Sequence, residues 1–402
     1  MRQVIYAWNY LEWGGAQVHI LALIKEARKE FSVAVVIPRG SDPQFVSYLD
    51  ELGVRVETFD AANPMSPPAG IREKIGHRVA KAKSEYSMLR ALEQFDLRDS
   101  IVHVDLLPHS SLLALTWLAM RTNVFITSHN ALPQVSGMRE ALWKLKAAAI
   151  SRFPTFHVFC SNEHAKRYFS SHYSAAVSGD IKVTYTSVNP EEIDQASADK
   201  EARMRLRSQV GIGEDETVVL GVGNFIDRKG RWTFLDAAKK MAESGSTEKV
   251  RFVWLTPTLP PQEDIVRIEA YGLGERFRLI ESAEIGGERP DILRFFRIAD
   301  IFALPSFVEG LPIALLEAMA TGLSSVSTNV YGIPEAVLHE ETGILIEPGD
   351  SEALASAIQR LAADPGLRTE MGRNARRLVL DKFDERIAAR TAIAAYKAAL
   401  DH

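Results

Sequence analysis

The sequence predicts an α/β protein made of two Rossmann-like, doubly wound domains. Its 402 residues exceed what one hydrophobic core usually serves, so two domains are expected. Short apolar runs rich in β-branched residues alternate with helix-like stretches, which is typical of parallel sheets covered by helices. Many of these runs are apolar throughout, as strands buried on both faces are. The pattern changes at residues 189–210, where the chain becomes highly charged, and we place the domain boundary there.

The expected elements follow in order along both domains. After the first strand, Val18, Leu21, Leu23 and Ile24 recur at helical spacing. The first domain, residues 1–195, is expected to contain the strands Val4–Asn9, Val33–Pro38, Val54–Phe59, Ile101–Leu106, Val124–Ser128, Phe156–Ser161 and Ile181–Thr186. The second, residues 205–378, is expected to contain Val218–Gly223, Val250–Thr256, Phe277–Glu281, Ile301–Leu304, Ser325–Thr328 and Gly343–Ile346. Residues 379–402 form a C-terminal segment with a helix at Glu385–Leu400.

Composition and charge exclude several classes of protein. The chain is 46% hydrophobic and 25% charged, as soluble globular proteins are, and its net charge of −5 comes without the basic stripe of a nucleic-acid-binding protein. No apolar run approaches the roughly 18 residues of a membrane span, and the N-terminus does not resemble a signal peptide. The expected compartment is therefore the cytoplasm. The single cysteine, Cys160, excludes an internal disulfide framework, and we expect no metal site.

The stretch from Ile71 to Leu92 combines helical spacing with many basic residues. One interpretation is a solvated helix face. The other is a surface for an anionic acceptor, or for peripheral association with the inner face of a membrane, because basic amphipathic helices bind anionic lipids. The sequence leaves both open. The basic residues are Arg72, Lys74, Arg78, Lys81, Lys83 and Arg90.

The strongest functional motif follows the expected strand Ile301–Leu304. Ligands of open α/β sheets bind at the carboxyl ends of strands, and the free N–H groups of a helix's first turn suit a diphosphate. Glu317, within the helix, can accept bonds from both hydroxyls of a ribose, and Glu309, in the loop, can accept bonds from a sugar. Taken singly, either glutamate is equally consistent with an exposed position. The helix is expected to begin over Gly310, Leu311, Pro312 and Ile313.

Three weaker motifs also lie at the ends of expected strands. Arg228 and Lys229 follow Gly221–Gly223, where a pair of cations can neutralise a departing diphosphate. Gly14 and Gly15 follow the first strand and permit the positive-φ or closely approaching backbone of a phosphate-binding loop, although a plain tight turn explains them as well. His129 ends a buried strand and is either a structural histidine or a residue that faces a bound sugar.

Together these motifs resemble those of the retaining glycosyltransferases of family 4, which have the GT-B fold, over nearly the whole chain. The resemblance rests on the Glu-x7-Glu spacing of Glu309 and Glu317, on the Glu-Ala-Met-Ala run at residues 317–320, and on Gly-Ile-Pro-Glu at residues 332–335. The stretch at residues 342–350 is also similar to that family's donor domain. One departure is Asn224, which stands where the family usually has an arginine, and Arg228 is the candidate to replace that cation.

The resemblance implies two domains facing a cleft, with the acceptor on the N-terminal side, the donor on the C-terminal side, and the C-terminal helix crossing back to the first domain. The implied donor is a nucleoside diphosphate sugar, with no cofactor and no metal. Glu309 would face the sugar, Glu317 would hold the ribose and Lys229 would bind the diphosphate. Gly14, Gly15 and His129 would close over the donor from the other side.

The implied reaction transfers a sugar to a hydroxyl acceptor with retention of configuration; the acceptor is a glycan, a lipid-linked glycan or a small molecule. No carboxylate in the sequence stands out as a covalent nucleophile, which favours a front-face route in which the leaving phosphate accepts the acceptor's proton. Two alternatives remain: a nucleotide-sugar epimerase of the same fold, and a non-catalytic protein that binds sugar nucleotides.

Overall fold

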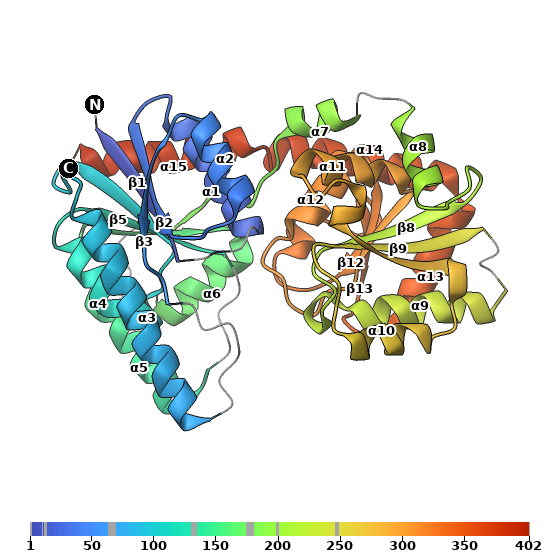
Figure 1. Cartoon of the computed structure of the whole chain (residues 1–402), viewed down its shortest axis with the longest axis horizontal. Helices are drawn as coiled ribbons and strands as arrows, with labels where there is room; N and C mark the ends of the chain where they lie inside the picture. Colours follow the sequence, from blue (N-terminus) through green and yellow to red (C-terminus); the bar gives the residue numbers. More distant parts are fainter. Residues whose placement is uncertain are drawn as a thin grey trace. The chain divides into compact units, whose positions relative to one another are not determined.

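A computed structural model describes residues 2–9, 11, 14–62, 70–129, 135–173, 181–197, 201–245 and 249–401. The chain folds into two compact units (Figure 1). The first comprises Met1–Thr186 together with Glu385–His402, and the second comprises Ser187–Asp384. The change of domain expected at residues 189–210 thus lies at Thr186–Ser187 in the structure, so the charged stretch belongs to the second unit.

The first unit is built on a seven-stranded parallel sheet with the order β3-β2-β1-β4-β5-β6-β7. From β1 the chain adds β2 and β3 on one side and then β4 to β7 on the other. The order therefore reverses between β1 and β4, where the loops after the strands diverge and ligands of such sheets bind. The strands are β1 (Gln3–Ala7), β2 (Ser32–Pro38), β3 (Arg55–Phe59), β4 (Ser100–Val104), β5 (Asn123–Ser128), β6 (Phe156–Cys160) and β7 (Lys182–Val183).

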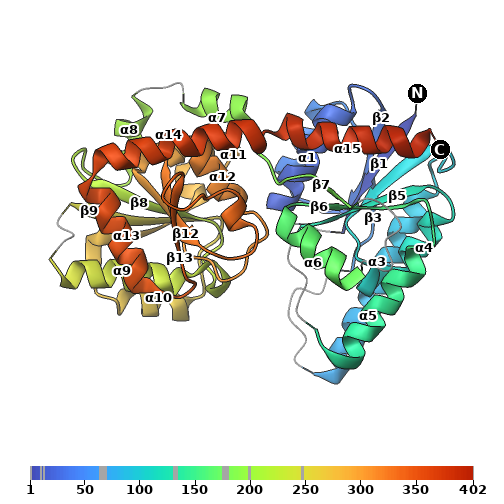
Figure 2. The ribbon, with the colours of Figure 1, turned by 180° about the vertical axis from the view of Figure 1, so that it is seen from behind.

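Helices cover both faces of this sheet and divide its core in two. On one face lie α1 (Gly15–Ala27), α2 (Pro43–Glu51) and α15 (Glu385–Leu400). On the other lie α3 (Ile71–Leu92), α4 (Pro108–Ala119), α5 (Gly137–Ile150) and α6 (Glu163–Tyr173). The helix α15 is last in the chain yet packs against α1, and its Ala392 and Tyr396 are fully buried (Figure 2).

The second unit has a six-stranded parallel sheet with the order β10-β9-β8-β11-β12-β13. Its order reverses between β8 and β11. The strands are β8 (Thr217–Val222), β9 (Val250–Thr256), β10 (Phe277–Glu281), β11 (Ile301–Leu304), β12 (Ser324–Thr328) and β13 (Gly343–Ile346). The helices are α7 (Pro190–Ser197), α8 (Ala202–Gln209), α9 (Arg231–Glu243), α10 (Gln262–Glu269), α11 (Arg289–Phe295), α12 (Ile313–Ala320), α13 (Ser351–Ala363) and α14 (Pro365–Lys382). Short 3-10 turns are η1 (Asp227–Lys229), η2 (Gly274–Arg276), η3 (Ser282–Ile285), η4 (Phe296–Ile298) and η5 (Ile333–Glu335).

The predicted fold class, two parallel α/β sheets, is confirmed, and each predicted strand overlaps an observed one. The largest difference in length is at β7, which pairs only with β6 at the edge of the sheet and keeps two of the residues expected over 181–186. The helices expected over Ile71–Leu92 and Glu385–Leu400 are α3 and α15.

The charged stretch after Pro190 contains the helices α7 and α8, and the Arg207 side chain is only 2% exposed. This guanidinium donates to the carbonyls of Ile298 and Glu216 and pairs with Asp300 at 2.7 Å. A count of charges does not distinguish such a buried arginine from solvated ones, since all five donors can be satisfied by carbonyls inside a fold.

Candidate functional site

A lysine–glutamate pair lies where the strand order of the second unit reverses. Lys229 is in η1, which follows β8, and Glu309 is in the loop that follows β11. The Lys229 Nζ atom is 2.6 Å from Glu309 Oε1, and the Arg228 guanidinium is 3.7 Å from Glu309 Oε2. Ser306 Oγ also donates to Glu309 Oε1, at 3.2 Å. The structure therefore brings three of the predicted residues together at the carboxyl ends of two neighbouring strands.

Gly230 allows the turn that carries Lys229 to pack against the loop that carries Glu309. Its φ is +75°, in the left-handed region, and a Cβ atom there would lie 1.9 Å from the carbonyl oxygen of Pro305. The two segments are also joined by the Phe307 N–H, which donates to the Arg228 carbonyl at 2.9 Å. Only glycine satisfies both demands. Sequence reasoning gave Gly230 no role, because a single glycine after a basic pair does not reveal what packs against it.

Asp227 holds the other side of the same turn. Its carboxylate accepts bonds from Arg231 Nε and Trp232 Nε1, both at 2.8 Å. Hydrogen bonding by Arg231, the largest cause, lowers the pKa of Asp227. The turn that carries Arg228 and Lys229 is thus fixed by contacts on both sides before any ligand binds.

Burial gives the two cations different environments. The side chains of Lys229 and Glu309 are 14% and 7% exposed, whereas that of Arg228 is 44% exposed. Because a pair shielded from water interacts more strongly than an exposed one, Glu309 fixes the position of the Lys229 ammonium. Arg228 also donates to the Val308 carbonyl at 3.1 Å. The arrangement places fixed positive charge beside a carboxylate that can accept from hydroxyl groups.

The first turn of α12 lies directly after this pair. The helix begins at Ile313 with Pro312 as its N-cap, and no side chain of the described chain caps it. Its first N–H groups therefore have the orientation that suits an anion. Leu311 is buried, and the Gly310 carbonyl accepts from the Gly332 N–H at 3.0 Å. Gly310 is not among the described glycines with a positive φ, so its backbone conformation does not require glycine.

Glu317 lies inside α12 and is only 3% exposed. Its Oε1 accepts a bond from Arg289 at 2.8 Å, and Arg289 also pairs with Glu192 of α7 at 3.2 Å. Burial raises the pKa of the Glu317 carboxyl, and Arg289 opposes this shift without cancelling it. Burial acts to lower the pKa of Arg289, but Glu317 and Glu192 outweigh it and raise that pKa.

Sequence reasoning missed Arg289. It is the first residue of α11, in the segment Gly286-Gly287-Glu288-Arg289-Pro290, and nothing in that segment sets it apart from the many exposed arginines of the chain. Its partner is 28 positions away, a separation at which no helical or strand period applies.

Gly14 and Gly15 lie at the start of α1 in the first unit. Gly14 is the N-cap with φ −165°, an extended conformation that any residue adopts, and Gly15 is the first helical residue. A Cβ atom on Gly14 would meet only the flexible Gln17 side chain, at 3.3 Å. The expected positive-φ loop is therefore absent at these two positions, and the glycine pair has no conformational requirement here. Trp13, quoted with them in the motif, lies outside the described residues.

His129 follows β5 and belongs to a buried group of histidines in the first unit. Its ring contacts that of His19 edge-on, with the centroids 5.5 Å apart, and its Nε2 is 3.9 Å from Asp105 Oδ2. Burial lowers the pKa of His129, while Asp105 acts in the opposite direction. The net shift is downward, so the imidazole is neutral near pH 7 and is not a fixed cation.

His103 extends this group deeper into the core. Its Nδ1 lies 2.6 Å from the Tyr396 hydroxyl and its Nε2 lies 2.8 Å from Thr127 Oγ1. Burial lowers the pKa of His103 to about 3. Sequence reasoning did not single out His19, His103 or Asp105, although Asp105 directly follows the end of β4 and was accessible to the same strand-end argument as His129.

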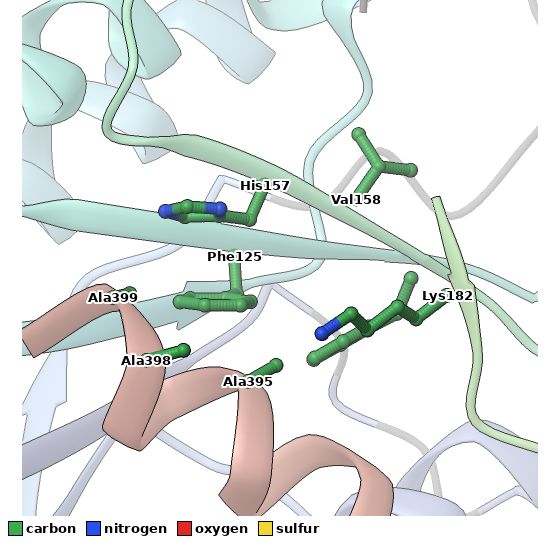
Figure 3. Close-up of a pocket in the computed structure, with 8 residues that line it drawn as sticks. Phe125, His157, Val158, Lys182, Ala395, Ala398 and Ala399 are labelled. Atoms are coloured by element: carbon green, nitrogen blue, oxygen red, sulfur yellow. The ribbon is translucent and has the colours of Figure 1, made fainter. Parts of the chain in front are cut away.

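A separate crevice of about 170 Å³ lies on the first unit between β5, β6, β7 and α15. Figure 3 shows the rings of Phe125 and His157 lying face to face, with Lys182 and the alanines of α15 around them. The ring centroids are 4.4 Å apart. None of the predicted site residues lines this crevice, and its volume is below the roughly 300 Å³ at which small-molecule sites begin.

The described residues contain no group of three or more His, Cys, Asp or Glu side chains placed to hold a metal ion. None of their helices combines the length and apolarity needed to cross a bilayer.

Comparison with known proteins identifies the family. Residues 202–378 match "Glycosyl transferases group 1", and residues 13–192 match "Glycosyltransferase Family 4". An uncharacterized glycosyltransferase of Methanocaldococcus jannaschii is 28% identical over 221 residues, 55% of this chain and 55% of that protein. The GDP-mannose-dependent alpha-(1-6)-phosphatidylinositol monomannoside mannosyltransferase of Mycolicibacterium smegmatis is 30% identical over 202 residues, 48% of this chain and 51% of that protein. The chain thus matches about half the length of these relatives.

A solved structure shares the fold over the whole chain. The structure of Anabaena HepE in complex with UDP and glucose has a TM-score of 0.76 at 18% identity, covering 99% of this chain and 100% of that one. Since the two family matches together extend from residue 13 to residue 378 and the GT-B fold spans both units, the chain belongs to glycosyltransferase family 4, a retaining family.

Proposed function

We propose that this protein transfers a sugar from a nucleoside diphosphate sugar to a hydroxyl acceptor with retention of anomeric configuration. The observation that carries the proposal is the fixed Lys229–Glu309 pair beside Arg228 and the first turn of α12. These groups supply what a departing diphosphate requires, namely fixed positive charge and N–H donors that need no reorganisation. Membership of a family of enzymes that use nucleotide sugars supports the same class of donor.

In the proposed reaction the bond between the anomeric carbon and the diphosphate oxygen breaks, and a bond from that carbon to the acceptor oxygen forms on the same face. The acceptor's proton passes to an oxygen of the departing diphosphate. Configuration is retained because departure and attack share one face. Lys229 and Arg228 would stabilise the negative charge that develops on the diphosphate. The N–H groups at the start of α12, which follows Gly310, Leu311 and Pro312 and begins at Ile313, would add to this.

The two glutamates have separate roles in this proposal. Glu309 would accept bonds from hydroxyls of the transferred sugar, and Glu317 would accept from the ribose. Arg289 would keep Glu317 ionised and oriented, because it holds Oε1 from within the protein. On the first unit, Gly14, Gly15 and the neutral His129 are assigned to the donor sugar by the family resemblance, with the acceptor on that unit's side.

Product analysis tests the proposal. Purified protein would be incubated with UDP-, GDP-, ADP- and dTDP-sugars, and thermal shift would select the donor that stabilises it, since a ligand of the native state raises the melting temperature. With that donor, the expected products are free nucleoside diphosphate and a glycoside with the donor's anomeric configuration, detected by proton NMR. An epimer formed without acceptor would instead show an epimerase. Binding with no turnover in the presence of a broad acceptor panel would contradict catalysis.

A further inference from the structure

The layer formed by α3, α4 and α5 carries most of the exposed large apolar side chains of the described chain. There are sixteen such side chains, and nine of them lie on these helices or at their ends. Figures 1 and 2 both show the N-terminal halves of α3 and α5 projecting together beyond the sheet of the first unit. Apolar side chains gathered in this way mark an interaction surface, whereas scattered ones need no explanation. The nine are Ile71, Ile75, Val79, Tyr86, Leu113, Met120, Met138, Leu142 and Leu145.

The helix α3 has apolar residues on two opposite faces. Its buried side chains, Ser84, Met88, Ala91 and Leu92, attach it to the unit and cluster towards its C-terminal end. At about 100° per residue, the exposed residues Ile71, Ile75, Val79 and Tyr86 fall within an arc of about 80° on the side turned away from those buried residues. Their side chains are 78%, 56%, 49% and 66% exposed. A merely solvated helix face does not require such a stripe.

Basic residues border this apolar stripe on both sides. On the same helical projection, Lys74, Arg78 and Lys81 lie along one edge and Arg72, Lys83 and Arg90 along the other. Lys81 is 3.6 Å from Glu85, and Arg90 pairs with Glu93. The other four basic residues make no salt bridge within the described part of the chain, and all four are exposed to solvent: Arg72, Lys74, Arg78 and Lys83. An apolar stripe between two basic edges is the pattern of a helix that lies in the interface of a bilayer.

The helix α5 repeats the arrangement in a shorter form. Met138, Leu142 and Leu145 are spaced to share one face and are 90%, 49% and 67% exposed. The buried residues Trp143, Ala147 and Ile150 lie on the opposite face. The helix α4 lies between the two, in contact with both, and adds Leu113, which is 85% exposed.

We propose that the α3–α4–α5 surface, defined by the nine apolar residues above and the basic edges of α3, binds peripherally to an anionic lipid bilayer. The apolar side chains would enter the headgroup region, and the basic residues would contact the lipid phosphates. Charge favours lipid over a second copy of the chain, because two such surfaces placed together would oppose their basic edges, whereas an anionic leaflet neutralises them. The surface lies outside the proposed reaction site, so this proposal stands or falls independently of the glycosyltransferase assignment.

Vesicle co-sedimentation of the full chain tests the proposal. Wild-type protein is expected to sediment with vesicles of phosphatidylcholine and phosphatidylglycerol but not with phosphatidylcholine alone, and to be released by high salt. Two variants should each bind at least about tenfold more weakly: Arg72→Glu/Arg78→Glu/Lys83→Glu, which reverses the edges, and Ile71→Ser/Ile75→Ser/Val79→Ser, which removes the stripe. A matched control, Lys239→Glu/Arg276→Glu/Arg373→Glu, changes the net charge equally at exposed positions of the second unit and should bind nearly as well as wild type.

A fluorescent label locates the contact without depending on the multiple variants. The only native cysteine, Cys160, is buried, so an introduced thiol can be labelled selectively. An environment-sensitive dye on Ile75→Cys or Leu142→Cys should shift to the blue on addition of anionic vesicles, whereas the same dye on Lys239→Cys should not.

Three results would overturn the proposal. The first is wild-type protein that stays in the supernatant with anionic vesicles. The second is equal sedimentation of wild type and both α3 variants, or an unchanged emission at residues 75 and 142. The third is a wild-type dimer in dilute buffer that the Ile71→Ser/Ile75→Ser/Val79→Ser variant converts to a monomer, since the stripe would then be covered by a second copy.

Discussion

The strand ends that carry the predicted site residues have different chemistry in the two units. In the second unit, the residues after β8 and β11 are charged and joined by short ion pairs, as in Lys229 with Glu309. In the first unit, the predicted residues after β1 and β5 are two glycines in ordinary backbone conformations and a neutral histidine, and the carboxylate of Asp105, after β4, lies 3.9 Å from that histidine. The same architecture thus carries fixed cations in the second unit and a neutral histidine beside a carboxylate in the first. Fixed cations are what a transfer reaction needs if the leaving group is a diphosphate.

The largest expected effect contrasts two glycines, one from each unit. Gly230→Ala should lower the free energy of unfolding by about 2–4 kcal/mol, because it combines a left-handed φ with overlap on the Pro305 carbonyl. Gly14→Ala should change it by less than about 0.5 kcal/mol, since its extended φ is open to alanine. Urea denaturation of both variants gives the comparison. Similar losses for the two would show that the turn at Gly230 does not pack as described.

The next effect concerns the fixed cation. Lys229→Ala should lower kcat about 100-fold or more, because the ammonium acts on charge that develops during the reaction. It should also lower the melting temperature, because the buried Glu309 carboxylate loses its closest cation, so kcat is compared at a temperature where both proteins are folded. Arg228→Ala should lower kcat less, as that side chain is more exposed. Lys239→Ala, an exposed lysine of α9, serves as the control. Turnover by Lys229→Ala equal to that of the control would remove Lys229 from the mechanism.

A third effect concerns nucleotide binding, where substitutions of Glu317 and Arg289 should differ in their dependence on pH. Glu317→Gln should weaken binding of the nucleoside diphosphate by about 1.5–3 kcal/mol, the range for charge-assisted bonds. Arg289→Gln removes the group that opposes the upward pKa shift of Glu317. When the pH is lowered, this variant should therefore lose its affinity for the nucleoside diphosphate at a higher pH than the wild type does. Calorimetric titration across pH measures both. An identical pH profile in Arg289→Gln and wild type would contradict the positioning role.

Arg289→Gln should also change how the free energy of unfolding depends on pH. A carboxyl whose pKa is raised by folding favours the folded state when it is protonated, so that stability is lost as the pH rises through the folded-state pKa. Arg289→Gln should therefore destabilise the protein more at pH values above the raised pKa of Glu317 than below it. The double variant Arg289→Gln/Glu317→Gln should lose this dependence, which urea denaturation at two pH values would reveal.

The smallest effect belongs to His129 in the first unit. Because burial keeps His129 neutral, His129→Asn should lower kcat/KM without altering its dependence on pH between about 6 and 8. The loss should be smaller than that of Lys229→Ala, since a neutral group is replaced rather than a charge. Disappearance of an ionisation in that pH range would show that His129 titrates during turnover, contrary to its buried environment.

Much of the fold was accessible from the sequence because parallel strands buried on both faces leave continuous apolar runs. The internal strands Val250–Thr256 and Ile301–Leu304 were predicted with their observed bounds for this reason. The weak point was β7, which pairs with β6 at only two residues. Edge position alone does not explain this difference, because β10 and β13 are also edge strands and their bounds were predicted.

The candidate site could be predicted where its residues follow strand ends, but not where they depend on packing. Glu309 and Lys229 belong to motifs at strand ends, so the sheet brings them together. Arg289 and Gly230 act through partners, Glu317 and Pro305, that only the folded chain places beside them. Arg207 shows the same limit, since the charged stretch around it indicated a domain boundary, while its guanidinium donates to the carbonyls of Ile298 and Glu216.

The position of α15 has a consequence for how the protein matures. The first unit takes its last helix from residues that follow the whole second unit in the chain, and those residues close its core through Ala389, Ala392 and Tyr396. During synthesis the ribosome therefore releases every strand of the first unit long before the helix that covers one face of its sheet. The second unit is continuous and can complete its core first. For that interval, the apolar side chains awaiting α15 are exposed to solvent and to chaperones that bind such surfaces.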